Sequence, residues 1–327
     1  TGRDGYAEFY KKDLTLQLLG PVGDKVEEWI IKGAQITKVD FGGLEWSDTG
    51  EVAEITLTIQ PDYWVLNYHV AKAKAHLQPN VIKTLKCLEY WFGPYPFYED
   101  SFKLVEAPYL GMEHQSSVTY GNKYRKGYLG RDLSGTGWGL KFDYIIIHET
   151  GHEWFANNIT YKDIADMWVH EGFTTYSENL FVDYHFGKKA SSEYVIGTRR
   201  GIGNKKPIIG PYNVNKGGSG DMYSKGANLL HTLRQVADND KLWRNILRGL
   251  NKDFYHKTVT TYEIENYISN SMIVDLSKIF DQYLRDVRIP IFEYKINDGE
   301  LKYRWSNVIT GFDMPVEINL DNKPIKL

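Results

Sequence analysis

The chain has 327 residues, of which 42% are apolar and 25% are charged, and its formal net charge is −3. This ordinary globular composition excludes disordered and collagen-like chains, and the slight acidic excess gives no basic surface for nucleic acid. No apolar run approaches the ~20 residues that a membrane-spanning helix needs. The single cysteine, Cys87, excludes an intrachain disulfide scaffold and a cysteine-rich zinc site.

The length suggests about two domains of roughly 100–200 residues each. Aromatic residues reach 14% of the chain, which predicts a large aromatic core. The chain opens at Thr1 with neither a basic region nor an apolar signal sequence, so its targeting is not indicated, and without an apolar membrane span we expect a soluble protein. Its compartment and oligomeric state cannot be read from these features.

Residues 1–66 are predicted to be rich in β-structure. Ile55, Leu57 and Ile59 alternate with polar residues, as in a half-buried strand. Shorter β-type runs and the turn signals between them are Trp29–Ile31, Ile36–Val39, Gly20-Pro21, Gly33 and Gly42-Gly43. No cluster of catalytic residue types occurs here.

The rest of the chain is predicted to be mainly helical, with Pro79 restarting a helix over 69–91, extended structure over 102–121 and a loop over 122–140. The expected helices that follow are Lys141–Asn157, Ala165–Phe186, Met222–Asp238, Lys241–His256, Thr261–Asn270 and Leu276–Val287. A loop rich in Gly and Pro is expected over 201–220. Residues 291–327 return to short alternating runs, so the expected domains are 1–66, 67–290 and 291–327.

His148-Glu149-Thr150-Gly151-His152 has the HExxH pattern. On a helix, residues four apart share a face, so both imidazoles can reach one metal ion, and Glu149 lies beside them to accept a proton from water. Gly151 costs the helix about 1 kcal/mol relative to Ala. The alternative is two ordinary histidines on a helix.

A catalytic zinc site needs a third protein ligand, and Glu171 on the next predicted helix is the candidate. If the two helices pack antiparallel, His148, His152 and Glu171 form a His₂Glu set with an open fourth position. The alternative for Glu171 is a solvated helix carboxylate.

HExxH followed by eighteen residues and a Glu resembles the gluzincin aminopeptidases of the aminopeptidase N and leukotriene hydrolase type. Three further segments resemble motifs of that family in the same order: Gly111-Met112-Glu113-His114, Tyr223-Ser224-Lys225-Gly226-Ala227 and Phe280-Asp281-Gln282-Tyr283-Leu284. The resemblance covers roughly residues 62–290. It implies an α+β fold: a thermolysin-like zinc peptidase domain, mainly helical with a small sheet, flanked by short β segments.

The resemblance also implies the role of each site residue. One Zn²⁺ per chain is held by His148, His152 and Glu171. Glu149 is the general base, Tyr223 stabilises the oxyanion, Glu113 binds the free α-ammonium of a peptide, and the Gly111 and Met112 backbone pairs with that peptide. Asp166 either orients a zinc-bound histidine or is an ordinary charge at a helix N-terminus.

Two departures from the family pattern stand out. His114 replaces the Asn of the exopeptidase signature, and one residue of that signature is missing before Met112; both departures lie next to Glu113. Gly218 stands where the leukotriene-processing branch has a tyrosine, so that side activity is not expected. The expected function is a zinc aminopeptidase acting on peptides with a free N-terminus. The alternatives are a thermolysin-type endopeptidase and a catalytically weak peptide-binding module.

Residues 1–61 are too short for the N-terminal β-domain that this family carries. Val26–Gly42 and Ile55–Ile59 are similar to the closing strands of a phage-type tail-tube subunit. The other interpretation is a truncated remnant of the family's own β-domain.

Overall fold

A computed structural model of the chain describes residues 11–19, 25–40, 56–60, 63–68, 72–297, 300–320 and 323–327. The chain divides into two compact units, Thr1–His76 and Leu77–Leu327. Within the ranges described, no helix is both long and apolar enough to cross a membrane.

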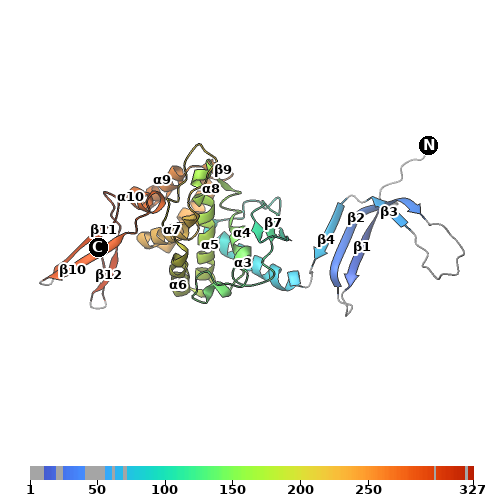
Figure 1. Ribbon diagram of the computed structural model, residues 1–327, viewed down its shortest axis with the longest axis horizontal. Coiled ribbons are helices and arrows are strands. Elements are labelled where there is room, and N and C mark those ends of the chain that lie inside the picture. Colours follow the sequence, from blue (N-terminus) through green and yellow to red (C-terminus); the bar gives the residue numbers. More distant parts are fainter. Residues whose placement is uncertain are drawn as a thin grey trace. The chain divides into compact units, whose positions relative to one another are not determined.

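The first unit contains a four-stranded antiparallel sheet formed by β1 (Lys12–Leu19), β2 (Lys25–Asp40), β3 (Thr56–Gln60) and β4 (Tyr63–Tyr68) (Figure 1). The long strand β2 pairs with each of the other three. The predicted β character is therefore confirmed for the residues described here.

Gly33 does not form the predicted turn. It lies inside β2 with φ of 62°, where the β1–β2 register shifts between the pairs Lys12↔Ala34 and Leu14↔Ile31. One extra residue on β2 at this shift is a β-bulge, and glycine accepts the left-handed conformation without a Cβ penalty. The predicted turns at Gly20-Pro21 and Gly42-Gly43 lie outside the described residues.

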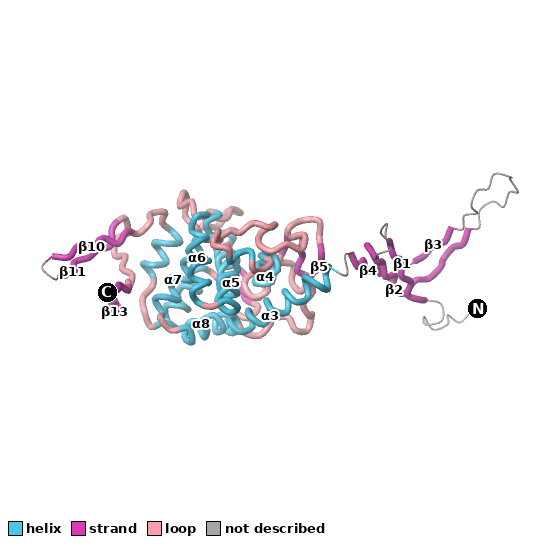
Figure 2. Tube along the Cα trace, turned by 90° about the horizontal axis from the view of Figure 1, so that it is seen from below, coloured by secondary structure: helices cyan, strands magenta, loops and turns pink. Residues whose placement is uncertain are grey.

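The second unit is mainly helical, with small sheets (Figures 1 and 2). Its helices are α3 (Gln78–Phe92), α4 (Tyr144–Gly151), α5 (Trp168–Phe186), α6 (Lys188–Thr198), α7 (Ser224–Ala237), α8 (Asp240–Asp253), α9 (Thr261–Met272) and α10 (Ser277–Phe280). The short 3₁₀ and π segments are η1 (Ala73–Leu77), which starts in the first unit, η2 (Trp138–Leu140), η3 (Ile164–Asp166), η4 (Arg199–Gly201), η5 (Gly220–Met222) and η6 (Asp281–Arg285).

Small groups of strands accompany these helices or extend from them. The strands are β5 (Leu104–Glu106), β6 (Gly111–Met112), β7 (Val118–Tyr120), β8 (Ile159–Tyr161), β9 (Lys257–Val259), β10 (Ile291–Asn297), β11 (Glu300–Ser306), β12 (Glu317–Leu320) and β13 (Lys323–Lys326). They form a β5-β7-β6 sheet, a parallel β8–β9 pair and the hairpins β10–β11 and β12–β13.

Helix α5 is the centre of this unit. Every side chain from Trp168 to Val182 is buried, and α5 packs against α3, α4, α6 and α7 (Figure 2). A helix that is buried all round lies within a core rather than on its surface. Residues placed on α5 are therefore fixed on all sides, which suits the support of a catalytic centre.

Three helical predictions differ from the structure. Helix α4 ends at Gly151 instead of Asn157, because the chain continues through wider i→i−5 bonds such as Asn157 N–H to the His152 carbonyl. Helix α6 was not predicted, since only three apolar side chains of this short helix are buried and Gly187 indicated a stop. The last predicted helix divides into α10 and the π-helical η6.

Candidate active site

Helix α4 carries the HExxH residues, and its N-terminus is held by Asp143. The Asp143 carboxylate accepts hydrogen bonds from the Ile146 backbone N–H, the Tyr120 hydroxyl and the Asn122 amide. Such an N-cap satisfies backbone donors that the helix itself leaves free. Because the whole of α4 is buried, these contacts fix the helix that presents the two histidines.

The structure brings His148, His152 and Glu171 together. The Nε2 atoms of His148 and His152 lie 3.4 Å and 3.5 Å from Glu171 Oε2, and one ligand atom of each residue lies within 4.8 Å of the others. All three side chains are buried. Helices α4 and α5 pack against each other, as the sequence-based hypothesis required.

These three residues fit a zinc ion. Two ligand atoms at ~2.0–2.1 Å from a tetrahedral zinc lie about 3.3–3.4 Å apart, close to the two separations found here. Glu171 Oε2 is buried and has no hydrogen-bond partner, so a cation would satisfy it. Burial lowers the pKa of His148, but the Glu171 and Glu178 carboxylates together raise that pKa well above its usual range. The site therefore favours a positive charge between these side chains.

The Nδ1 atom of each imidazole also has a hydrogen-bonding partner. His148 Nδ1 lies 3.0 Å from Glu178 Oε1, while the other Glu178 oxygen accepts a hydrogen bond from the Tyr194 hydroxyl. His152 Nδ1 lies 3.1 Å from the Phe155 carbonyl oxygen. Such partners fix the tautomer and leave Nε2 free for a metal.

Glu178 is a site residue that the sequence analysis missed. It lies seven residues after Glu171, so the two carboxylates share a face of α5 two turns apart. This spacing was the available signal. Asp166, which was considered for the orienting role, instead accepts hydrogen bonds from the hydroxyls of Tyr212 and Thr261.

Glu149 lies between the two imidazoles and strand β6. Burial and the neighbouring Glu113 and Glu171 carboxylates raise the pKa of Glu149, while the imidazoles oppose this shift. A Cβ placed on Gly111 would lie 2.6 Å from Glu149 Oε1. A side chain at position 111 would therefore displace the Glu149 carboxylate, and β6 forms one wall of the site.

Strand β6 also brings Glu113 into the site. Carboxylate oxygens of Glu113 and Glu149 and a ring nitrogen of His152 lie within 4.8 Å of one another. The Glu113 backbone carbonyl accepts a hydrogen bond from the Asn157 amide. In the described sheet β6 pairs only with β7, on one side, so its other edge has no strand partner there.

Tyr223 lies beside His148, at the N-cap of α7. Its ring stacks on the His148 ring with a centroid separation of 6.0 Å. Partial burial, reinforced by the Glu171 carboxylate, raises the pKa of the Tyr223 hydroxyl, so it keeps its proton at neutral pH. Tyr223, His148, Glu149 and Glu178 all line a cleft of about 720 Å³.

Comparison with protein families matches residues 79–283 to the peptidase family M1 domain. The match covers more than half of the chain and includes every site residue described above. The chain belongs to peptidase family M1. Membership of this metallopeptidase family implies a zinc cofactor and confirms the predicted recognition and α+β fold class.

Relatives within family M1 carry aminopeptidase names. The chain is 27% identical over 183 residues to mouse endoplasmic reticulum aminopeptidase 1, a match covering 52% of this chain and 19% of the relative. It is 25% identical over 255 residues to Lactobacillus helveticus aminopeptidase N, covering 69% of this chain and 30% of that protein. The chain thus spans less than a third of the length of these curated M1 relatives.

A solved family M1 structure shares the fold. The M1 zinc metallopeptidase of Deinococcus radiodurans, in a mutant bound to the peptide Tyr-Ser-Ala, superposes with a TM-score of 0.50 at 21% identity. The likeness covers 64% of this chain and 44% of that one.

Proposed function

We propose that this chain is a zinc-dependent aminopeptidase that holds one Zn²⁺ through His148, His152 and Glu171. The observation that carries the proposal is the convergence of two imidazole nitrogens on a buried carboxylate oxygen that has no other partner. The aminopeptidase names of the family M1 relatives agree with it.

Glu149 is the general base in this proposal. When bound, zinc supplies Lewis acidity that lowers the pKa of water toward ~7 and polarises the scissile carbonyl. Glu149 takes a proton from the attacking water while the water oxygen bonds to the carbonyl carbon. Glu149 then gives that proton to the leaving amide nitrogen as the C–N bond breaks. Its raised pKa suits both transfers, because a very weak base would not accept the proton.

Tyr223 stabilises the negative charge that develops on the former carbonyl oxygen. Its protonated hydroxyl is a hydrogen-bond donor, and its position beside His148 places it at the rim of the same cleft. Donors aimed at a developing oxyanion are typically worth 10²–10³ in kcat.

Glu113 confers exopeptidase specificity by binding the free α-ammonium of the substrate. Its carboxylate lies beside Glu149, so an ammonium paired with it is held one residue from the scissile bond. The backbone of Gly111 and Met112, on the free side of β6, pairs with an extended peptide as an added strand. The substrates are therefore peptides with an unblocked N-terminus.

Metal analysis combined with hydrolysis of a panel of aminoacyl-coumarins tests the zinc and the base together. We expect one zinc per chain, and we expect Glu149→Gln to keep the zinc while lowering kcat by roughly 10²–10⁴-fold. A Glu149→Gln variant that hydrolyses the panel at the normal rate would contradict the assigned base.

Blocked substrates test the role of Glu113 separately. Acetylation of the substrate amine removes the charge that Glu113 binds, so N-acetylated peptides should be cleaved far more slowly than free ones. Equal rates on both would remove the exopeptidase assignment and leave a zinc endopeptidase, which the family relatives do not favour.

A further inference from the structure

A second cavity, of about 440 Å³, lies behind one wall of the active-site cleft. Neighbouring residues in two segments face opposite sides of this wall. Arg200, Gly201 and Ser224 line the cleft, whereas Arg199, Ile202 and Lys225 line the second cavity. The catalytic residues proposed above do not line it.

Lys225 is the central charge of this cavity. Its side chain is buried, with 6% exposure, and its ammonium donates one hydrogen bond, to the Asp286 carbonyl oxygen at 3.1 Å. An ammonium has three donors, and no carboxylate pairs with Lys225 among the residues that the structure describes. A buried charge without an ionic partner is costly, and burial lowers the pKa of Lys225 accordingly.

The carboxylates nearest Lys225 are already engaged. Asp221 accepts hydrogen bonds from the backbone N–H groups of Gly203 and Asn204. Asp286 forms a two-point ion pair with the guanidinium of Arg288. Both carboxylates favour the charged form of Lys225, but neither forms a direct ion pair with it among the described residues, so the ammonium retains donors for an anion that enters from the cavity.

Arg199 supplies a second available cation. Its Nε donates to the Asn228 amide oxygen at 2.8 Å, and in the described ranges no carboxylate pairs with its guanidinium. No Asp or Glu is among the described residues that line this cavity. The polar end of the cavity therefore carries positive charge only.

The remaining walls are apolar and partly aromatic. Trp305, Tyr283, Met314 and Ile202 line them, and the Trp305 N–H is already bonded to the Met314 carbonyl oxygen. Because this N–H is already used, Trp305 contributes its apolar ring to the cavity lining, next to its edge contacts with the Phe292 and Phe312 rings, and such a ring suits contact with another planar ring.

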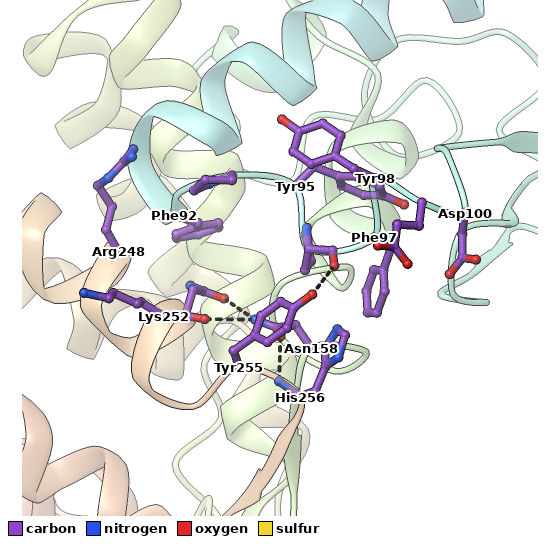
Figure 3. A pocket seen from close by; sticks show the side chains of 14 residues that line it. Phe92, Tyr95, Phe97, Tyr98, Asp100, Asn158, Arg248, Lys252, Tyr255 and His256 are labelled. Atoms are coloured by element: carbon purple, nitrogen blue, oxygen red, sulfur yellow. Dashed lines mark hydrogen bonds between the residues drawn. The ribbon is translucent and has the colours of Figure 1, made fainter.

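A different cavity in the same unit shows what a charge-balanced pocket looks like (Figure 3). It contains about 550 Å³ and also has an arginine and a lysine, Arg248 and Lys252, on its α8 side. Glu99 and Asp100 line it as well, and Figure 3 shows Asp100 on the side opposite these cations, with Phe97 and Tyr255 between. Because both signs are present, this cavity does not favour an anion.

We propose that the Lys225 cavity binds a small organic acid, with a carboxylate paired to Lys225 and Arg199 and a planar apolar ring against Trp305. Its volume lies within the ~300–1,000 Å³ of small-molecule sites. The proposal does not depend on the peptidase activity, because the residues that carry it are outside the catalytic set.

Calorimetric titration of the zinc-loaded chain with 2-naphthoate and with its neutral isostere 2-naphthamide tests this assignment. We expect saturable binding of one naphthoate, at least ten-fold tighter than the amide. Arg199→Gln and Lys225→Met should each weaken naphthoate binding at least ten-fold. The matched variants Arg248→Gln and Lys252→Met, in the charge-balanced cavity, should bind it as the unmodified chain does.

Three results would overturn the proposal: no naphthoate binding, equal binding of acid and amide, or a loss confined to the Arg248 and Lys252 variants. Arg199 is exposed, so its substitution leaves the core intact and keeps the test valid if Lys225→Met fails to fold. Circular dichroism of each variant checks the fold before titration.

Discussion

Three buried glutamates surround the two imidazoles, and their surroundings give them different properties. Burial acts to raise the pKa of Glu171, but the close His148 and His152 imidazoles hold that pKa well below its usual range. Burial raises the pKa of Glu149 with no such hydrogen bond. Glu178 is held by the Tyr194 hydroxyl and His148. These different environments match the roles of ligand, base and orienting group that the proposed function gives to the three side chains.

Replacing Glu178 with Gln should weaken zinc binding roughly 10–100-fold, because the neutral amide no longer raises the basicity of His148. Competition with a chromogenic chelator measures this affinity. Glu193→Gln is the matched control, since Glu193 accepts a hydrogen bond from the Trp138 indole and lies outside the site. Equal zinc affinity in the two variants would show that Glu178 is only a packing residue.

Gly111→Ala should impair catalysis without removing the metal. The added methyl would lie 2.6 Å from Glu149 Oε1, so the carboxylate must move. A displacement of about 1 Å at a reacting group costs on the order of 10²-fold in rate. Steady-state kinetics and zinc content measure the two effects. Gly217→Ala is the control, because its nearest neighbour, Met167 Sδ, lies at an ordinary 3.8 Å.

The sequence predicted that His148, His152 and Glu171 come together, because their spacing follows from helix geometry. His148 and His152 lie one helical turn apart, and Glu171 lies in the first turn of the next long helix. These three positions were therefore enough to predict a shared site. Glu178 was missed because its spacing from Glu171 was its only signal, and a lone Glu within a helix matches no motif. The Phe155 carbonyl that holds His152 is a backbone group, so no residue type could have indicated it.

At the level of elements, the glycine inside the HExxH helix has a structural reason. A Cβ on Gly151 would lie 2.8 Å from Ser177 Oγ and 3.1 Å from Thr174 Cγ2, both on α5. Gly151 lowers the intrinsic helix stability of α4, as the sequence predicted, but it allows α4 to approach α5 closely. This close approach brings the two imidazoles to Glu171. Sequence periodicity could indicate both helices. It could not indicate the distance between them, which depends on the small side chains that face each other at their contact.

The contact between α5 and α7 should make stability depend on pH. His231 on α7 is buried, and its Nδ1 atom lies 3.2 Å from the side-chain amide nitrogen of Asn179 on α5. Burial lowers the pKa of His231 to about 4. Because the histidine pKa is lower in the folded state than in the unfolded state, the contribution of His231 to the free energy of unfolding is complete above the unfolded-state pKa of ~6.5. That contribution is lost as the pH falls toward 4. The expected loss between pH 7 and pH 5 is about 2 kcal/mol.

Urea unfolding of the unmodified chain and of His231→Gln at both pH values measures this loss. The glutamine side chain cannot become charged, so the stability difference between the two proteins should shrink by that amount at pH 5. Other titrating groups are common to both and cancel in the comparison. Parallel pH profiles would show that His231 is not the group responsible.

Across the whole molecule, the aromatic core predicted from composition lies in the second unit. Its largest fully buried side chains include Trp154, Trp168, Trp243, Tyr176 and Tyr194. Composition could predict that such a core exists, but not where it lies, because aromatic residues are spread along the chain. Only tertiary contacts gather them around α5.

Among the side chains described in the first unit, the buried apolar ones are Ile31 and Ala34 alone, whereas Leu16, Leu19 and Ile36 are more than half exposed. Because the described side chains of this unit bury little apolar area, the hydrogen bonds of β1–β3 should open at lower free energy than those of α4 and α5. Hydrogen exchange followed by mass spectrometry should find β1–β3 exchanging well before α5. Added zinc should protect α4 and α5 further, since a ligand of the native state stabilises the elements that hold it. Equal protection of β2 and α5 would contradict the separate stabilities inferred from burial.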